Sequence, residues 1–332
     1  MSKKKTKKYI AIIGTGYWGK NLVRNFYQLG VLKTICDLDK NILKKFEKLY
    51  PDTETTQNIR KILLDKKIKG VVISTPAITH YELTKKCLLA GKNVLVEKPL
   101  TLDLIQAKKL IKLAQDKKRV LMVGHLLHYH PAIIRLKQLV KNGVLGKIQY
   151  VYSNRLNFGK LRTEENILLS FAPHDISVIL SLFEKLPKKV ATHGMSWLKK
   201  GIADTTISYF EFNKKQGAHI FVSWLNPFKE QKLVVVGDKK MAVFDDREKN
   251  KLTTYSHKIK WDYNKMPTAK QAPSKIISIS PSEPLREECQ HFLNCIKTRK
   301  NPRTDGKESL NVLKTLTACQ KSLDNKGKTI NL

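Results

Sequence analysis

A glycine-rich turn near the start of the chain, IGTGYWG, constrains the fold more than any other feature. It follows the apolar run YIAII (9–13), precedes a helical pattern over Tyr17–Leu29, and places Gly14, Gly16 and Gly19 in G-x-G-x-x-G spacing. Between a parallel strand and a helix, such glycines permit a tight turn, the approach of a pyrophosphate and close packing of the helix. The turn therefore predicts a dinucleotide site facing a helix N-terminus, in preference to a purely structural turn.

Short apolar runs alternate with helical patterns over the first third of the chain. Such alternation predicts parallel strands with right-handed crossover helices on both faces, which is the doubly wound Rossmann sheet of an α/β protein. We assign residues 1–127 to this domain. The predicted strands are 9–13, 32–36, 71–74, 93–96 and 120–124, and the predicted helices are 17–29, 43–49, 59–64, 81–90 and 104–115.

The pattern changes after about residue 127. KIQYVYSNRLNF (147–158) and several later runs alternate as half-exposed strands do, and NKKQG and GDKK predict hairpin turns between them. Residues 128–332 are therefore predicted to form an α+β domain with a large, mostly antiparallel sheet. Helices are predicted over 132–141, 174–183, 284–299 and 306–325, and the polar segment 246–283 carries no assignment.

Composition argues against a nucleic-acid function. The 332-residue chain is 41% apolar, which is enough for a sizeable core. Its formal net charge is +35, but it holds 53 lysines against 10 arginines. Arginine is the residue that recognises bases and phosphates bidentately, so the scattered lysines indicate solvated surfaces with no specific nucleic-acid partner.

Cysteine usage and the N-terminus point to the cytoplasm. The five cysteines include no C-x-x-C pair, so neither a disulfide framework nor a metal site is expected. The basic start MSKKKTKK resembles a signal-peptide n-region, but the apolar run after it ends at once in GTGYWGK, which argues against a signal peptide. No apolar run predicts a membrane span.

Further cofactor-binding candidates lie at the ends of other predicted strands. Asp37 closes the second strand, where an acidic group accepts hydrogen bonds from ribose hydroxyls and repels a 2′-phosphate, so NAD is favoured over NADP. ISTPAITH (73–80) follows the next central strand. Its Thr75-Pro76 pair equally suits the start of a helix. The candidates that line the cofactor in this loop are Ser74, Thr75, Pro76 and His80.

The stretch VEKPL (96–100) ends a buried strand in charged residues. Glu97 and Lys98 emerge at the same sheet edge as the glycine turn, and Pro99 biases Lys98 toward an extended conformation. A stiffened lysine at a cofactor cleft can polarise an oxygen or move its proton. The residues alone leave open the alternative of an exposed ion pair at a helix entry.

Taken in order, GTGYWGKN, STPAITH and VEKPL resemble the Gfo/Idh/MocA oxidoreductase family over essentially the whole chain. The resemblance implies that Lys98 is catalytic and that its peptide bond to Pro99 is often cis. The candidate cofactor-binding residues are Gly14, Gly16, Tyr17, Trp18, Gly19, Asp37, Ser74, Thr75, Pro76, His80, Glu97 and Lys98.

Residues 154–180 resemble the family segment that carries the second catalytic residue, with His174 in the expected place. Many family members carry Asp four residues before this histidine, where this chain has Ser170. R-x-N-x-G-x-x-R (155–162), APHDIS and the run from Ser223 to Asp246 resemble the nucleotide-sugar 3-dehydrogenase branch. The candidate substrate-binding residues are Lys98, Arg155, Asn157, Arg162, Asn166 and His174.

The resemblance implies NAD-dependent oxidation of the 3-hydroxyl of a UDP-N-acetylhexosamine or its uronate. The 3-keto product would feed a pyridoxal-phosphate aminotransferase in cell-surface glycan or lipid A synthesis. Two alternatives remain: a dehydrogenase of a free sugar or polyol such as inositol, and a regulator that binds NAD or a sugar without turnover. The exposed face of the antiparallel sheet suggests a homo-oligomer, a dimer or tetramer as in this family.

Overall fold

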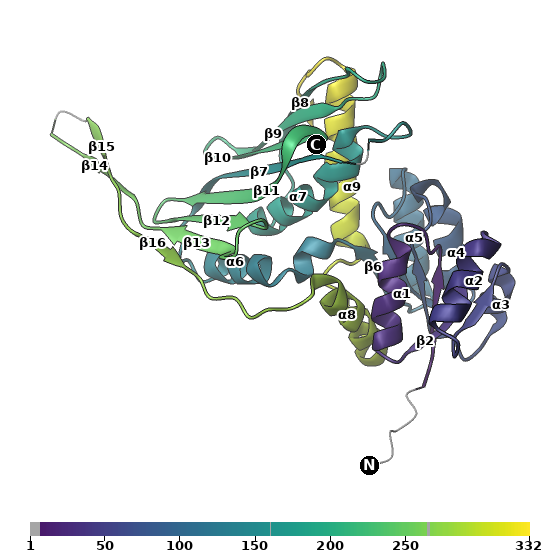
Figure 1. Cartoon of the computed structure of the whole chain (residues 1–332). Helices are drawn as coiled ribbons and strands as arrows, with labels where there is room; N and C mark the ends of the chain where they lie inside the picture. The colour runs from purple at the N-terminus through teal and green to yellow at the C-terminus, as the bar shows by residue number, and fades with distance from the viewer. Residues whose placement is uncertain (1–6, 160, 264–265) are drawn as a thin grey trace, which may run out of the picture. The chain divides into compact units, whose positions relative to one another are not determined.

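A computed structural model describes residues 7–159, 161–263 and 266–332 (Figure 1). The chain divides into two compact units. The first comprises residues 1–129 and 283–310, and the second comprises 130–282 and 311–332. These units differ from the predicted segments 1–127 and 128–332 because residues 283–310 group with the first unit.

The first unit contains a parallel sheet of six described strands in the order β3-β2-β1-β4-β5-β6. The doubly wound Rossmann fold is therefore confirmed. The order reverses between β1 and β4, which is where such sheets bind ligands. The strands are β1 (Ile10–Ile13), β2 (Leu32–Cys36), β3 (Glu54–Thr56), β4 (Gly70–Ile73), β5 (Asn93–Glu97) and β6 (Leu121–Gly124).

Side-chain caps start several of the helices in this unit. Asp39 accepts a hydrogen bond from Asn41 N at α2, and Asp103 accepts one from Gln106 N at α5, which satisfies orphan N–H groups. The helices are α1 (Gly19–Gln28), α2 (Lys40–Leu49), α3 (Ile59–Leu64), α4 (His80–Leu89), α5 (Leu104–Asp116) and α8 (Pro284–Thr298), with short 3-10 turns at Ala77–Thr79 and Leu126–Tyr129.

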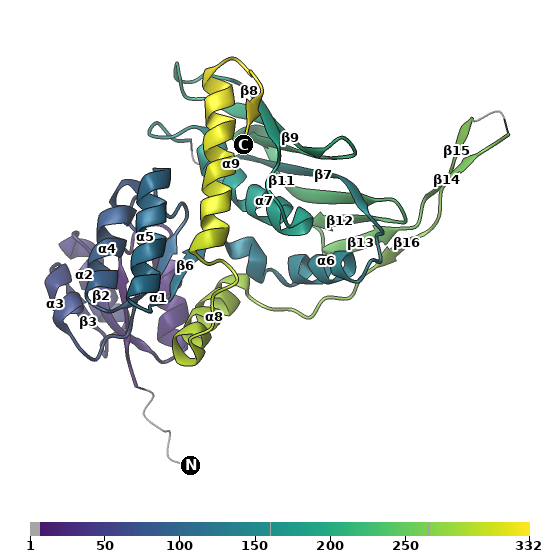
Figure 2. The same cartoon turned by 180° about the vertical axis from the view of Figure 1, so that it is seen from behind.

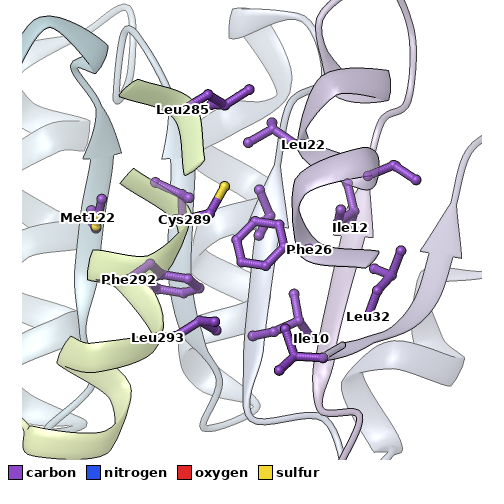
Figure 3. Close-up of a cluster of buried hydrophobic side chains, with 14 of the residues drawn as sticks. Ile10, Ile12, Leu22, Phe26, Leu32, Met122, Leu285, Cys289, Phe292 and Leu293 are labelled. Atoms are coloured by element: carbon purple, nitrogen blue, oxygen red, sulfur yellow. The ribbon is translucent and has the colours of Figure 1, made fainter. Parts of the chain in front are cut away.

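Helix α8 completes the core of the first unit although it lies far away in sequence. Phe26 of α1 meets Phe292 of α8 edge-on, with ring centroids 6.5 Å apart. Ile10, Leu22 and Cys289 are fully buried in the same cluster (Figure 3). Burial of this apolar surface fixes α8 against α1 and β1.

The second unit contains a sheet of nine described strands in the order β16-β13-β12-β11-β7-β10-β9-β8-β17. Neighbours pair antiparallel except β7 with β10, which confirms the mostly antiparallel prediction. The strands are β7 (Ile148–Phe158), β8 (Lys189–Met195), β9 (Thr205–Asn213), β10 (Gln216–Ser223), β11 (Leu225–Gly237), β12 (Met241–Asp245), β13 (Leu252–Tyr255), β16 (Ser274–Ile276) and β17 (Ile330–Asn331).

The helices of the second unit pack on one face of this sheet. They are α6 (Pro131–Lys141), α7 (Ile167–Phe183) and most of α9 (Gly306–Asp324). Phe183 of α7 stacks on Phe212 of β9, and Ser322 of α9 accepts a hydrogen bond from Thr192 N of β8. Within the described residues, no helix combines the length and apolar character needed to cross a membrane.

Two parts of the second unit differ from the sequence prediction. Helix α7 begins at Ile167 rather than His174, because Asn166 caps it and the apolar periodicity of ILLSFA continues through Pro173. The unassigned segment 246–283 contains β13, β16 and a separate two-stranded ribbon, β14 (Lys258–Trp261) and β15 (Pro267–Lys270).

Replacing Phe292 by alanine tests the contribution of α8 to the first unit. The substitution would leave a cavity against Phe26, so we expect the free energy of unfolding to fall by about 3–5 kcal/mol. The midpoint of urea unfolding, followed by circular dichroism, measures this loss. Arg286→Ala, on the exposed side of the same helix, is the matched control and should stay near wild type. Equal midpoints for the two variants would contradict this role of α8.

Candidate functional site

The glycine turn leaves open space at Gly16, the position where a pyrophosphate would approach the backbone. A Cβ on Gly14 would lie 2.6 Å from Thr75 Cγ2, and φ there is +84°, so this position requires glycine. A Cβ on Gly19 would collide with Gly14 O. A Cβ on Gly16 would meet none of the described atoms within 4 Å. Backbone is therefore exposed at Gly16 beside the N-terminus of α1, as an anionic ligand requires.

Asp37 lies at the end of β2 and is joined to the glycine turn. Its Oδ2 accepts hydrogen bonds from Thr15 N at 2.7 Å and Thr15 Oγ1 at 2.8 Å, and its Oδ1 accepts one from Asp39 N at 3.0 Å. Burial alone would raise the pKa of Asp37, but these hydrogen bonds outweigh it and hold the pKa below the ordinary value. Asp37 is therefore a carboxylate at neutral pH, as ribose recognition requires.

The loop after β4 contacts both the glycine turn and the E-K-P segment. Ser74 Oγ donates to Gly14 O at 2.6 Å. The buried ring of His80 stands between two carbonyl oxygens, with Nδ1 2.7 Å from Pro99 O and Nε2 2.9 Å from Thr75 O. Thr75 Oγ1 and Thr79 Oγ1 also hydrogen-bond at 2.6 Å. A 3-10 turn follows Pro76, as the helix-start interpretation expects, but it has no side-chain cap, so Thr75 does not act as a helix cap.

His80 is a neutral tie between two loops of the site. Burial lowers the pKa of His80 and the charge of Lys98 lowers it further, against the opposing effect of the two carbonyls. The ring therefore stays uncharged near neutral pH and carries one N–H, which can donate to only one of the two carbonyl oxygens at a time. When Nδ1 donates to Pro99 O, the ring joins the loop after β4 to the loop after β5.

The E-K-P segment ends β5 at the same edge, and the Lys98–Pro99 peptide bond is cis. Trp18 Nε1 donates to Glu97 Oε1 at 2.6 Å, so the start of α1 is tied to Glu97. A Cβ on Gly124 would lie 2.9 Å from Glu97 Oε2, so glycine at the end of β6 makes room for this carboxyl. Burial raises the pKa of Glu97 despite the opposing effects of Trp18 and Lys98.

These contacts fit a dinucleotide cofactor. Open backbone at Gly16 and an ionised Asp37 provide a phosphate cradle and a ribose acceptor within one unit. Tyr17 is exposed beside the turn. The structure brings the sequence-predicted cofactor residues to one edge of the sheet, where β1, β2, β4 and β5 end.

A buried histidine near Glu97 pairs with a partly buried carboxyl group, and no sequence pattern predicted this pair. His125, directly after β6, places Nδ1 2.6 Å from Glu308 Oε2 in the first turn of α9. His125 lies close enough to Glu97 that a positive charge on its ring would lower the pKa of that carboxyl. The two partners are 183 positions apart, so only the fold reveals them. The sequence analysis also did not predict that Thr15 hydrogen-bonds Asp37, although the position of Thr15 inside the G-x-G motif could have indicated a role in the site.

Arg155 of the second unit is held by a carboxylate of its own unit. Its Nε donates to Asp175 Oδ2 at 2.6 Å and its Nη2 to Asp175 Oδ1 at 3.2 Å, while Ser153 Oγ also donates to Asp175 Oδ1 at 2.7 Å. The Arg155 side chain is 11% exposed. A buried charge needs such a partner, so Arg155 ties β7 to α7.

Asn166 also has a structural task, and Arg162 is more accessible. Asn166 Oδ1 accepts from Leu169 N at 3.0 Å as the cap of α7, and its Nδ2 donates to Gln320 Oε1 at 2.9 Å. Arg162 is 41% exposed, with a neighbouring ion pair to Glu165 at 2.8 Å. Asn157 is half-buried near the end of β7. Of the predicted substrate contacts on β7 and before α7, Arg162 and Asn157 best retain accessible polar groups.

His174 and Ser170 lie one turn apart on the same side of α7. His174 is half-buried and Ser170 is buried. Asp175, the next residue after the histidine, belongs to the Arg155 pair. Position 170 therefore offers His174 a hydroxyl where the resemblance implies a carboxylate.

A dinucleotide-binding sheet followed by an α/β domain with a large sheet is an architecture that nicotinamide-dependent oxidoreductases use. Residues 8–125 match the NAD-binding Rossmann fold of the Gfo/Idh/MocA oxidoreductase family, and residues 137–332 match the C-terminal alpha/beta domain of the same family. The chain belongs to this family, and its first unit is an NAD-binding domain.

Curated relatives of this chain differ in the reactions they are named for. A 2,7-anhydro-N-acetylneuraminate hydratase from Mediterraneibacter gnavus is 27% identical over 58% of this chain and 54% of its own length. A UDP-N-acetylglucosamine 3-dehydrogenase from Acidithiobacillus ferrooxidans is 26% identical over 74% of this chain and 76% of its own. The chain thus spans about half the length of the first of these relatives.

A solved structure of the UDP-N-acetylglucosamine 3-dehydrogenase GnnA from Acidithiobacillus ferrooxidans superposes with a TM-score of 0.85. It is 22% identical, and the match covers 96% of this chain and 98% of that one. At this identity the likeness establishes a shared fold.

Asp37→Ala tests the cofactor preference. Removing the carboxylate should weaken NAD binding by about 1.5–3 kcal/mol, the range for a hydrogen bond to a charged group, and relax discrimination against NADP. Calorimetric titration with both dinucleotides measures the change. Asp39→Asn keeps the cap of α2 and is the matched control. Tighter binding of NADP than NAD by the wild type would contradict the role given to Asp37.

His80→Gln tests the neutral tie between the two loops. A buried histidine whose pKa is lowered must take up a proton on unfolding once the pH falls below about 6.5, so stability should fall there. Urea midpoints at about pH 7.5 and about pH 5.5 should differ less in His80→Gln than in wild type. His193→Gln, at an exposed histidine, should keep the full difference. An unchanged pH dependence in His80→Gln would remove His80 from this explanation.

Proposed function

We propose that this protein is an NAD-dependent dehydrogenase that oxidises the 3-hydroxyl of a UDP-N-acetylhexosamine or its uronate. The observation that carries the proposal is the position of Lys98. It follows β5 at the edge where the glycine turn and Asp37 lie, and its neighbour Glu97 hydrogen-bonds Trp18 of that turn. A lysine at this edge can act on a substrate oxygen beside a nicotinamide.

NAD, when bound, supplies the chemistry by accepting a hydride from the sugar carbon. Gly16 and Asp37 would hold its pyrophosphate and adenosine ribose. Lys98 would polarise the reacting oxygen and His174 would accept the hydroxyl proton, or the two residues would exchange these roles. The ties of His80 to Pro99 O and of Glu97 to the glycine turn would keep the lysine-bearing loop in place.

Arg162 is the residue that we propose for the substrate diphosphate. It is the more accessible of the two arginines, and a guanidinium suits two phosphate oxygens at once. Asn157 can both donate to and accept from sugar hydroxyls or an acetamido group. Binding energy from the distant nucleotide would then orient carbon 3.

Similarity to a UDP-N-acetylglucosamine 3-dehydrogenase over about three quarters of both chains supports this choice of substrate. A relative named for a free sugar derivative favours the alternative of an enzyme without a nucleotide requirement. Thermal stabilisation by UDP-sugars but not by free sugars or inositols would separate the two.

The product is proposed to be a 3-keto sugar nucleotide that a pyridoxal-phosphate aminotransferase consumes. Oxidation of a secondary alcohol by NAD is uphill near neutral pH, so removal of the ketone would draw the reaction forward. NADH should accumulate poorly with this protein alone and better when an aminotransferase and an amino donor are present. A new carbonyl at carbon 4 or 6 would contradict the proposal.

Arg162→Ala tests recognition of the diphosphate. With UDP-N-acetylglucosamine or its uronate, KM should rise about tenfold or more while kcat changes less, because the lost contact lies far from the reacting carbon. NADH formation measures both constants. Leu161→Ala, at the neighbouring exposed position, is the control and should leave both near wild type. Equal wild-type activity on free N-acetylglucosamine would exclude a diphosphate requirement.

Lys98→Ala and His174→Ala test the proton-transfer pair. Loss of a general base should lower the rate by about 10²–10⁴. NAD affinity, measured by titration, should change little in His174→Ala, which separates a catalytic defect from a folding defect. Turnover near wild type in both variants would exclude the pair from the mechanism.

A further inference from the structure

One edge of the second unit's sheet carries the ends of both β7 and β8. Strand β7 runs parallel to β10, and β9 runs antiparallel to both β10 and β8, so β7 and β8 point the same way. One row of paired residues crosses these four strands at that edge: Met195, Thr205, Ser223 and Leu156. The loop after β8 (196–204) and the segment after β7 (161–166) therefore leave the sheet at the same edge.

This loop contacts the segment that carries the proposed diphosphate residue. Lys199 Nζ in the loop donates to Thr163 O at 3.3 Å. Ile167 N, at the start of α7, donates to Ala203 O at 3.0 Å. Arg162 directly precedes Thr163. The loop after β8 therefore lies beside the part of the second unit that would bind the substrate diphosphate.

A buried carboxyl group fixes the main chain of the same loop. Asp204 Oδ2 accepts hydrogen bonds from Trp197 N at 2.6 Å and from Leu198 N at 2.9 Å. Asp204 Oδ1 accepts one from Trp224 Nε1 at 2.6 Å, and Asp204 and Trp224 are both buried. The main chain at Trp197 is therefore held to the core of the second unit.

The ring of Trp197 is exposed although its main chain is held. The residue is 60% exposed. Exposure alone does not identify a ligand, because single apolar side chains are common on protein surfaces. Here the ring belongs to a fixed loop beside Arg162, where a nucleotide is expected. Tryptophan offers a large flat surface at a small cost in conformational entropy, and nucleobases stack on such rings.

We propose that the indole ring of Trp197 stacks on the nucleobase of the substrate's nucleoside diphosphate. This inference rests on the proposed function, from which it takes the UDP-sugar and the contact of Arg162 with the diphosphate. Lys199, whose ammonium group lies at Thr163 O, adds positive charge beside that diphosphate. Every base has a π face, so Trp197 would raise the affinity for the nucleotide without selecting uracil over other bases.

Calorimetric titration with UDP tests the stack. The full chain is saturated with NAD, so that UDP does not enter the dinucleotide site. Trp197→Ala should weaken UDP binding about tenfold, within the range measured when a stacking ring is removed. Trp197→Phe keeps an aromatic ring and should retain most of the affinity. Equal UDP affinity in the wild type and Trp197→Ala, or a wild type that does not bind UDP, would overturn the proposal.

Trp261→Ala is the matched control and should bind UDP as the wild type does. Trp261 is similarly exposed, at 68%, but it lies in the β14–β15 ribbon. This ribbon lies between β13 and β16 in sequence, and those strands stand at the opposite end of the strand order from β8. Figures 1 and 2 both show the ribbon projecting away from the sheet of the second unit.

Tryptophan fluorescence locates the bound base. The chain holds four tryptophans, and a base stacked on Trp197 should quench its emission. UDP should therefore quench the wild type and Trp261→Phe, whereas Trp197→Phe should bind UDP with little quenching. Quenching that persists in full in Trp197→Phe would place the base elsewhere and overturn the stack.

The outcomes separate this inference from the proposed function. NADH formation from UDP-N-acetylglucosamine, with equal UDP affinity in the wild type and Trp197→Ala, would overturn the stack alone. UDP binding that depends on Trp197, without oxidation at carbon 3, would support the stack and contradict the proposed reaction. Sedimentation equilibrium completes the comparison: weaker self-association of Trp197→Ala with unchanged UDP binding would assign the ring to an interface between copies and overturn the stack.

Discussion

The contact between the glycine turn and the loop after β4 is the constraint on which the candidate cofactor site depends. Ser74 donates to Gly14 O, and no side chain could be added at Gly14 or Gly19 without collision. The same loop contacts the E-K-P segment through His80, whose ring nitrogens lie against Thr75 O and Pro99 O. Trp18, in the glycine turn, donates to Glu97 of the E-K-P segment, so the three loops are connected to one another. The site is thus rigid because its loops hold one another.

Local signals sufficed for most of the first unit. The strands and helices around the glycine turn follow from apolar runs, glycines and caps that lie within a few residues of one another. Strand β3 was missed because Glu54–Thr56 is short and polar, and it joins the sheet by pairing with β2. Helix α8 was found as a helix, but its place in the first core depends on contacts such as Phe26 with Phe292, which no local pattern encodes.

The polar residues of the second unit show the limit of motif spacing. Arg155 and Asn166 stand where a substrate-binding segment was expected. The largely buried Arg155 is paired with the carboxylate of Asp175, and Asn166 caps the start of α7. Both side chains therefore have partners within the protein. A sequence gives the order of polar residues along a strand, but it does not say which of them hydrogen-bond within the protein and which stay available for a ligand.

Both units are assembled from separated stretches of chain. The first needs residues 283–310 for α8 and the Glu308 that meets His125, and the second needs residues 311–332 for most of α9 and for β17. As the chain leaves the ribosome, the glycine turn emerges early, but the core behind it stays open until α8 follows. Neither unit can finish folding well before the other during synthesis, so the final steps of both fall together, after nearly the whole chain has been made.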